Sequence, residues 1–177
     1  QILMGIDESS VTYNITTGSS DDLLDLRDPT SGDPNDTFTG DDTFDLGGGD
    51  DTLVVSETDF TGLGTASIAN TETLFVVSDD SDEEVDGNVN LDNFETTDVI
   101  ELRNDANTAT GGIGHGLTLN NFQTGRTLKA DLDVNAGTLT INGESNSTVV
   151  NLELDVDGSV SLDGLNLTNV RTLNINT

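Results

Sequence analysis

The chain has 177 residues, enough for one domain or two small ones with a buried core. It carries 34 acidic and 5 basic residues, a formal charge of −29, so it is not expected to bind nucleic acid or an anionic membrane, since both need basic patches. Cysteine is absent, which excludes a disulfide framework, and no run is apolar and long enough to span a bilayer.

Residues 1–36 predict short strands followed by an acidic loop. The apolar start Gln1–Ile6, the alternating segment Val11–Thr16 and Leu23–Leu26 are strand candidates. Prolines and aspartates from Asp28 to Asp36 indicate a loop, and helical periodicity is found in no part of the chain. The chain starts at Gln1 without a basic and apolar leader pattern, as expected of a segment of a longer product.

Residues 37–55 contain two glycine and aspartate turns. Leu46–Val54, LGGGDDTLV, fits the nine-residue pattern G-G-x-G-x-D-x-U-x except at its first position, and Thr37–Asp45 is a weaker copy. Glycine permits positive φ and close approach of carbonyl oxygens, aspartate supplies charged oxygens, and the apolar residue two places on points inward. Each copy should therefore be a tight turn that leads into a short strand, although a pair of acidic turns joining ordinary strands fits the same letters.

In these turns the sequence resembles the repeats-in-toxin (RTX) family. The resemblance implies a parallel β-roll that holds Ca²⁺ between stacked turns. A third copy is weaker, since Asn35 stands at its apolar position. Asp33 and Asp51 are 18 residues apart, the separation that would stack two pairs of nonapeptides.

Residues 56–177 repeat a unit of alternating character. Its pattern is apolar, any, aliphatic, any, Asn, any, Glu/Gln/Arg, Thr, with a period near 25. The copies are Ala66–Thr73, Val89–Thr96, Leu117–Thr124 and Leu165–Thr172, with a degenerate unit at Leu139–Ser145.

A loose period built only of alternating strands predicts an all-β parallel β-solenoid with each repeat stacked on the last, continuous with the calcium-binding turns as one domain. Asparagine tolerates a left-handed backbone, so Asn70, Asn93, Asn121 and Asn169 should stack at one corner and bond one another. The alternative is an antiparallel β-sandwich, which would also alternate but needs no asparagine at the same point of every unit.

The units, Asn169–Ile175 above all, resemble the β-strand repeats of bacterial surface-layer proteins. That resemblance implies a secreted structural protein at the cell surface whose folding and lattice assembly are driven by Ca²⁺. We expect a self-assembling subunit that polymerises head to tail with copies of itself, with cell-surface polysaccharide as a further candidate partner. The alternative is a calcium-dependent adhesin module that recognises a glycan or a surface.

Carboxylate and carbonyl oxygens at the glycine turns suit Ca²⁺, which takes 6 to 8 oxygen ligands. An acidic cluster before Gly87 is either a second ion site or a solvated loop. The candidate ligands are Asp33, Asp36, Gly40, Asp41, Asp42, Asp45, Gly49, Asp50, Asp51, Asp79, Asp80 and Asp82.

Catalysis has little support in this sequence. His115 is the only histidine, and its surroundings, Gly111–Gly116, indicate a flexible turn without the Lys and Ser/Thr of a phosphate-binding loop. A single histidine without cysteine leaves no basis for a transition-metal site or a Cys-His nucleophile. We therefore expect the protein not to be an enzyme.

Overall fold

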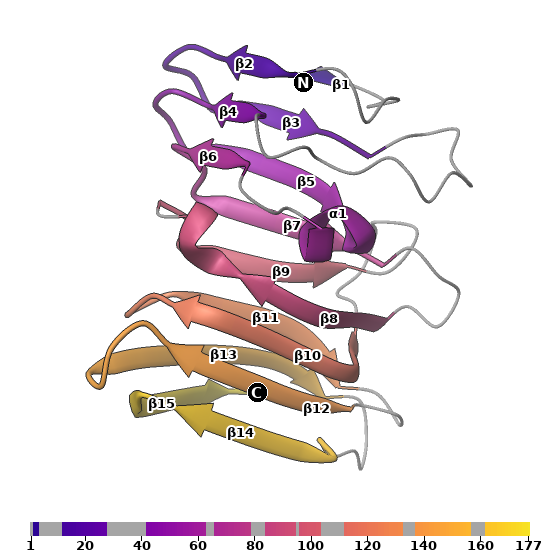
Figure 1. Cartoon of the computed structure of the whole chain (residues 1–177), viewed down its shortest axis with the longest axis vertical. Coiled ribbons are helices and arrows are strands. Elements are labelled where there is room, and N and C mark those ends of the chain that lie inside the picture. The colour runs from indigo at the N-terminus through magenta and orange to yellow at the C-terminus, as the bar shows by residue number, and fades with distance from the viewer. Residues whose placement is uncertain are drawn as a thin grey trace.

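The computed structural model shows a parallel β-solenoid (Figure 1). It describes residues 2–3, 12–27, 42–62, 66–78, 84–94, 96–103, 112–132, 137–156 and 162–177. Every strand pairing in these residues is parallel, which overturns the antiparallel sandwich alternative.

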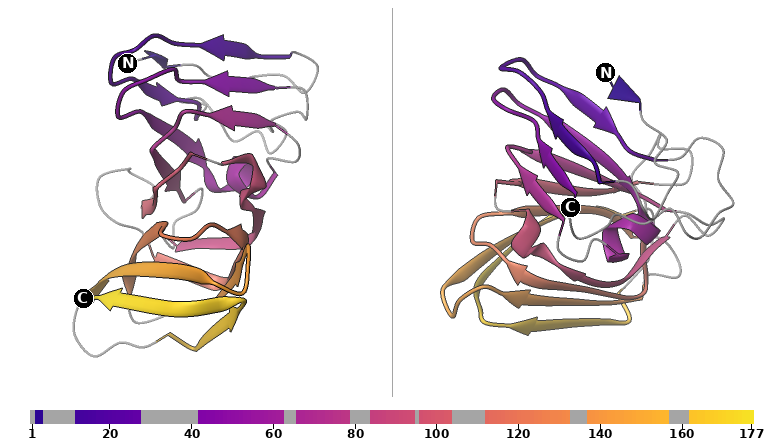
Figure 2. Two further views of the ribbon diagram at one scale, coloured as in Figure 1. Left: turned by 90° about the vertical axis from the view of Figure 1, so that its left-hand side faces the viewer. Right: turned by 45° about the horizontal axis from the view of Figure 1, so that its top comes forward.

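The odd-numbered strands form one continuous face, here called the long face, in the order β1 to β15. They are β1 (Ile2–Leu3), β3 (Leu23–Asp25), β5 (Thr52–Ser56), β7 (Thr73–Val77), β9 (Val99–Arg103), β11 (Thr127–Leu132), β13 (Thr148–Val156) and β15 (Val170–Asn176). The chain returns through the even-numbered strands on the other side, as the turned views in Figure 2 show.

The even-numbered strands form what we call the split face, because it is interrupted between β6 and β8. The first group is β2 (Asn14–Thr16), β4 (Thr43–Asp45) and β6 (Ser67–Ala69). The second group is β8 (Glu84–Asn90), β10 (Gly112–Phe122), β12 (Thr138–Gly143) and β14 (Gly164–Thr168). A single bridge, Ile68 to Phe94, links β6 to the coil that contains β8.

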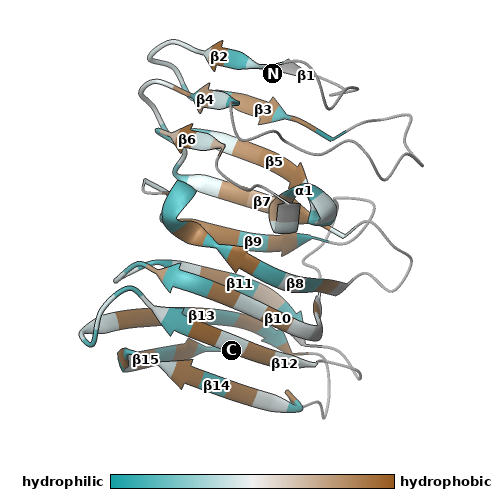
Figure 3. Ribbon diagram, viewed as in Figure 1, coloured by the Kyte–Doolittle hydropathy of each residue, from teal (hydrophilic) through white to brown (hydrophobic). Residues whose placement is uncertain are grey.

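Stacked aliphatic side chains form the core. On the long face Leu24, Leu53, Leu74, Ile100, Leu128 and Leu152 lie in register and are almost completely buried. Each such side chain contributes about 1.5–3 kcal/mol by its removal from water. The period-two alternation that predicted these strands is visible as alternating hydrophobic and polar bands in Figure 3.

Both nonapeptides lead into strands, as predicted. Phe44 on β4 and Leu53 on β5 are the apolar residues of the two copies, and both are buried. The predicted 18-residue stacking is wrong: Asp51 lies between Asp22 in the preceding coil and Glu72 in the following one. Loops of unequal length separate the coils, so a fixed nonapeptide period cannot set their register.

The predicted asparagine corner is correct at three positions of four. Asn70, Asn121 and Asn169 have positive φ of 55°, 56° and 58°. Asn93 instead lies in a 3-10 turn, η1 (Leu91–Asn93). The repeat alignment matched Val89 with Leu117, but in the structure Val89 pairs with Leu119, a register shift of two residues. A register irregularity between Ile113 and Leu117 accompanies this shift.

The expected asparagine ladder at that corner is also wrong, because each corner amide bonds a different group. Asn70 donates to Asp45 Oδ1 at 2.7 Å, and Asn169 donates to the Gly143 carbonyl oxygen at 3.5 Å. A ladder does form on the flat part of the split face. The Asn142 amide nitrogen donates to Oδ1 of Asn120, its register partner in the preceding coil, at 2.8 Å. The Asn120 amide nitrogen donates diagonally to Oδ1 of Asn88 at 2.6 Å, two residues from its register partner Asn90. The ladder runs through Asn88, Asn120 and Asn142.

One short helix, α1 (Glu57–Gly62), departs from the expectation of no helix. Ser56 caps it: the Asp59 backbone N–H donates to Ser56 Oγ at 3.1 Å, and Ser56 Oγ donates to Asp59 Oδ2 at 2.8 Å. Ser56 is thus the N-cap of the helix, and the Ser-x-x-Asp spacing was its signal in the sequence. The helix packs against β8 at the interruption of the split face, where Phe60 and Phe94 have ring centroids 6.1 Å apart.

The glycine-rich segment around His115 is a strand rather than the predicted turn. Residues from Gly112 onward belong to β10, which pairs with β8, β11 and β12. Gly114 lies where an added Cβ would come within 2.7 Å of the Asp86 side chain, so glycine there permits close stacking of two coils. The glycines therefore serve packing in a strand, which letter patterns alone do not distinguish from a turn.

Candidate metal site at the glycine turn

The turn between β4 and β5 is shaped by contact with the preceding coil, which contains Gly18 and Asp21. Gly47 has φ of 86° and Gly49 has φ of 146°, backbone conformations that favour glycine. The Gly48 N–H donates to the Gly18 carbonyl oxygen at 3.0 Å. A Cβ at Gly47 would overlap that same oxygen, and one at Gly49 would lie 2.8 Å from the Asp21 backbone nitrogen. These glycines permit close approach of two coils.

Aspartates at the turns extend the backbone ladder with their side chains. Asp42 Oδ1 accepts from the Tyr13 N–H at 2.8 Å, and Asp51 Oδ1 accepts from the Asp22 N–H at 2.7 Å. Asp45 Oδ1 accepts from the Gly47 N–H at 3.0 Å in addition to Asn70. Three of the predicted ligands thus have a structural role, in which a carboxylate in one coil binds a backbone N–H of the same or an adjacent coil.

Asp42 and Asp51 are the buried turn aspartates, and Asp51 is completely buried. Its Oδ2 atom has no hydrogen-bond partner among the described residues. Leaving a buried acceptor unsatisfied costs about 1–3 kcal/mol, and more when the group is charged. Glu72 lies next to it, since Glu72 Oε2 accepts from the Asp51 N–H at 2.8 Å. This pair of carboxylates is the best candidate for a cation site in the described chain.

None of the remaining predicted ligands that the structure describes is seen to contact Asp51 and Glu72 with its side chain. Asp50 is exposed, and its N–H donates to Asp21 Oδ1 at 3.0 Å. Among the residues that the structure describes, no three acidic or histidine side chains converge on one point. Asp33, Asp36, Gly40, Asp41, Asp79, Asp80 and Asp82 lie outside the described residues.

The acidic residues at this corner that sequence reasoning missed are Asp22 and Glu72. They are 29 residues before and 21 residues after Asp51, so no fixed period relates the three. The only signal was the general one that each coil enters its long-face strand through an acidic or hydroxyl-bearing turn. Their alignment depends on the register, which the loop lengths set.

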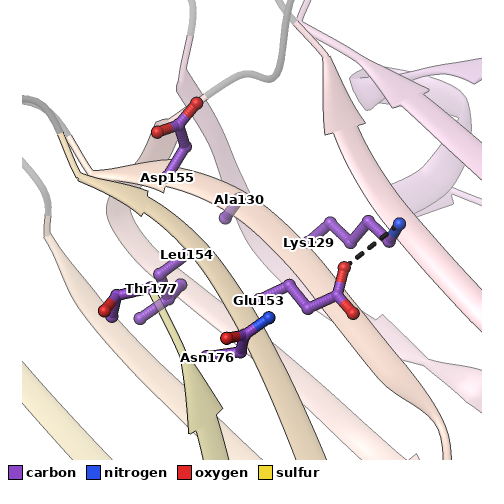
Figure 4. A pocket seen from close by; sticks show the side chains of 7 residues that line it. All are labelled: Lys129, Ala130, Glu153, Leu154, Asp155, Asn176 and Thr177. Carbon is purple, nitrogen blue, oxygen red and sulfur yellow. Dashed lines mark ion pairs between the residues drawn. The ribbon is translucent and has the colours of Figure 1, made fainter.

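Two cavities of about 260 Å³ each lie elsewhere on the solenoid. One is at the interruption of the split face, between β6 and η1, and includes Ser67 and Asp92. The other lies where β11, β13 and β15 end and is shown in Figure 4, with Lys129 Nζ 3.1 Å from Glu153 Oε2. Neither lining contains histidine, so among the described residues neither cavity pairs a nucleophile with an imidazole base.

No family model, curated protein or solved structure matches this chain. The resemblance to RTX and surface-layer repeats therefore rests on the motifs alone. In the described part of the chain, no helix is long and apolar enough to cross a membrane.

Proposed function

We propose that this protein is a structural, self-associating subunit of an extracellular surface layer or filament, and that Ca²⁺ stabilises it. The single observation that carries the proposal is the open end of the solenoid at β14 and β15. The wider chemistry of the chain supports it, because the described residues form stacked strands and ladders with no evident catalytic constellation. The proposal does not require a further ligand.

The last coil exposes the side chains that form the core elsewhere. Leu165, Leu167 and Ile175 are 37%, 39% and 55% exposed. Their register partners in the preceding coil are exposed by at most 1%; these are Leu139, Ile141 and Leu152. The interior of the solenoid is thus uncovered at this end, and both β14 and β15 have one edge without a partner among the described strands.

An open parallel edge above an apolar cross-section favours another coil of the same kind. A second copy of this chain supplies one, because its β1 and β2 are also edge strands of the two faces. Tyr13 and Ile15, beside and within β2, are partly buried and pack on the core, so they would complete the apolar contact. Pairing of unlike ends generates an open polymer rather than a closed dimer.

The calcium part of the proposal rests on Asp51. Its buried, unpartnered oxygen and the adjacent Glu72 carboxylate are hard oxygen ligands of the kind Ca²⁺ prefers, and carbonyl oxygens and water would complete the shell. A bound cation would neutralise two neighbouring carboxylates in the folded state, and the unfolded chain lacks the site, so binding would add to folding stability. Extracellular modules with Kd of about 10⁻⁴ to 10⁻³ M fill only after export.

Self-association is tested by charging the open end. Ile175→Lys places an ammonium group in the exposed apolar cross-section, and Thr172→Lys, on the outer side of the same strand, is the matched control. Sedimentation velocity should show polymers for the parent protein and for Thr172→Lys, but monomers for Ile175→Lys. Removal of residues 1–6, which include β1, should also give soluble monomers. Polymers that persist in both Ile175→Lys and the deletion would refute end-to-end pairing.

Calcium stabilisation is tested by thermal unfolding followed by circular dichroism, with magnesium at equal ionic strength as control. Calcium at about 100 times Kd should add about 2.7 kcal/mol to the free energy of unfolding. Asp51→Asn keeps an acceptor for the Asp22 N–H but removes the charge, so the variant should lose most of this response. Equal stabilisation of both proteins by calcium and magnesium would contradict the site.

A further inference from the structure

The acidic residues of this solenoid are concentrated toward its N-terminal end. Residues 1–100 contain 25 acidic residues and one basic residue, and residues 101–177 contain 9 acidic and 4 basic residues. The net charges are −24 and −5 of the total −29. The two parts share one fold and the same kind of backbone ladder. They differ in how much negative charge must be neutralised when the coils stack.

One corner of the long face shows this change coil by coil. The carbonyl oxygens of Asp22, Asp51, Glu72 and Asp98 each accept the N–H that begins the next long-face strand, so these residues stack in what we call the corner column. Neighbouring strands are about 4.8 Å apart, so like charges in a column repel. In the described residues of the three coils from Asp22 to Glu72 the one basic side chain is Arg27, which pairs with Asp25 outside the column.

Arg126 occupies the same position in the coil after Asp98 and ends the acidic column. Its side chain is 2% exposed and reaches into the preceding coil: Nε donates to the Thr97 carbonyl oxygen at 2.7 Å, and Nη2 donates to the Phe94 carbonyl oxygen. Burial lowers the pKa of Arg126 to about 10, against the opposing effects of Asp98 and Glu144. It is therefore still a cation at neutral pH.

A second row of stacked residues in the same region also contains basic side chains of the chain itself. Glu101, Lys129 and Glu153 are stacked on β9, β11 and β13, and the ammonium group of Lys129 pairs with Glu153 (Figure 4). Arg103 pairs with Glu101 at 2.6 Å. The two glutamates of this row are thus balanced by bases of the chain itself.

We propose that Arg126 is an internal counter-cation that makes the coils from β10 onward independent of divalent ions, so that calcium controls the folding of the coils from β2 to β7 alone. This deepens the proposed function and rests on its calcium part. The independent observation at the corner column is the buried Oδ2 of Asp51, which has no hydrogen-bond partner among the described residues and is available to a cation. In solenoids each repeat contacts only its neighbours, so one end can open while the other stays folded.

The test is hydrogen exchange measured by mass spectrometry on the whole chain, in calcium and after chelation with magnesium added at equal ionic strength. Chelation should accelerate exchange at least tenfold in β2 to β7 and change it less than twofold in β10 to β13. Equal acceleration in all strands would overturn this inference while leaving calcium stabilisation intact. No acceleration anywhere would instead refute the calcium part of the proposed function, and with it this inference.

A variant pair tests the role of Arg126 itself. Arg126→Met removes the buried charge with similar volume, and Arg171→Met removes an exposed base from the last coil as the matched control. After chelation, rapid exchange should extend through β9 to β11 in Arg126→Met and stop at β7 in Arg171→Met. If Arg126→Met is poorly folded even in calcium, the exchange pattern of the parent protein still decides the proposal. The same boundary in both variants would overturn the assignment to Arg126.

Discussion

Gly47 offers the sharpest test of how closely the coils are stacked. Gly47→Ala introduces a methyl group that would overlap the Gly18 carbonyl oxygen and lie 3.0 Å from its carbonyl carbon and 3.2 Å from the Thr17 carbonyl oxygen. These are backbone atoms of the preceding coil, so no rotamer change can relieve the overlap. The φ of 86° adds strain for any residue with a Cβ.

The expected cost of Gly47→Ala follows from these two terms. A left-handed backbone costs an L-residue about 1–2 kcal/mol, and overpacking costs about 1–3 kcal/mol, so the sum is about 2–5 kcal/mol. The whole free energy of unfolding of a domain is about 5–15 kcal/mol. The substitution should therefore remove a large share of it.

Gly48→Ala is the matched control for this substitution. Gly48 is the next residue, its backbone lies outside the left-handed region and no atom lies within 4 Å of an added Cβ. It should be neutral or stabilising by about 0.4–1 kcal/mol, since alanine restricts the unfolded chain. Urea unfolding followed by circular dichroism compares the two. Free energies of unfolding that agree within about 0.5 kcal/mol, the range of ordinary surface substitutions, would refute the stacking at Gly47.

Two further substitutions test the turns and the cap. Ser56→Ala should cost about 1 kcal/mol of unfolding free energy, because the N-terminus of α1 loses its capping oxygen; thermal unfolding measures it, and an unchanged midpoint would count against the cap. Asn169→Val should cost about 1–3 kcal/mol of unfolding free energy, because a β-branched residue is strained at φ of 58°. Asn169→Gly, the control, should be nearly neutral. Equal stabilities of the two variants would contradict a left-handed corner.

Much of the fold could be predicted from local patterns. Alternation in Val11–Thr16 and in the repeated units identified strands, and asparagine predicted a left-handed corner correctly at three positions of four. The parallel arrangement followed from the repeat, because sequential strands on one face of a stacked coil must run the same way. These features depend on neighbouring residues, and neighbouring residues are what a sequence shows.

The candidate site could be predicted only in part, because it depends on the register between coils. Asp51 was identified by its glycine turn, but its partners Asp22 and Glu72 are set by loops that place successive members of the corner column 29 and 21 residues apart. The burial of Asp51 was also not predictable, since the nonapeptide pattern places an aspartate there whether or not a coil covers it. The role of Arg126 needs both the register and the burial.

The most direct test of the central claim is electron microscopy of the wild-type chain in calcium, with analysis of the periodicity along any filament. End-to-end stacking continues the parallel ladder from one copy to the next, so the filaments should be unbranched and give a repeat of about 4.7–4.8 Å along their axis. Particles that stay monomeric at high concentration, or filaments in which this repeat is absent or runs across the axis, would contradict the account.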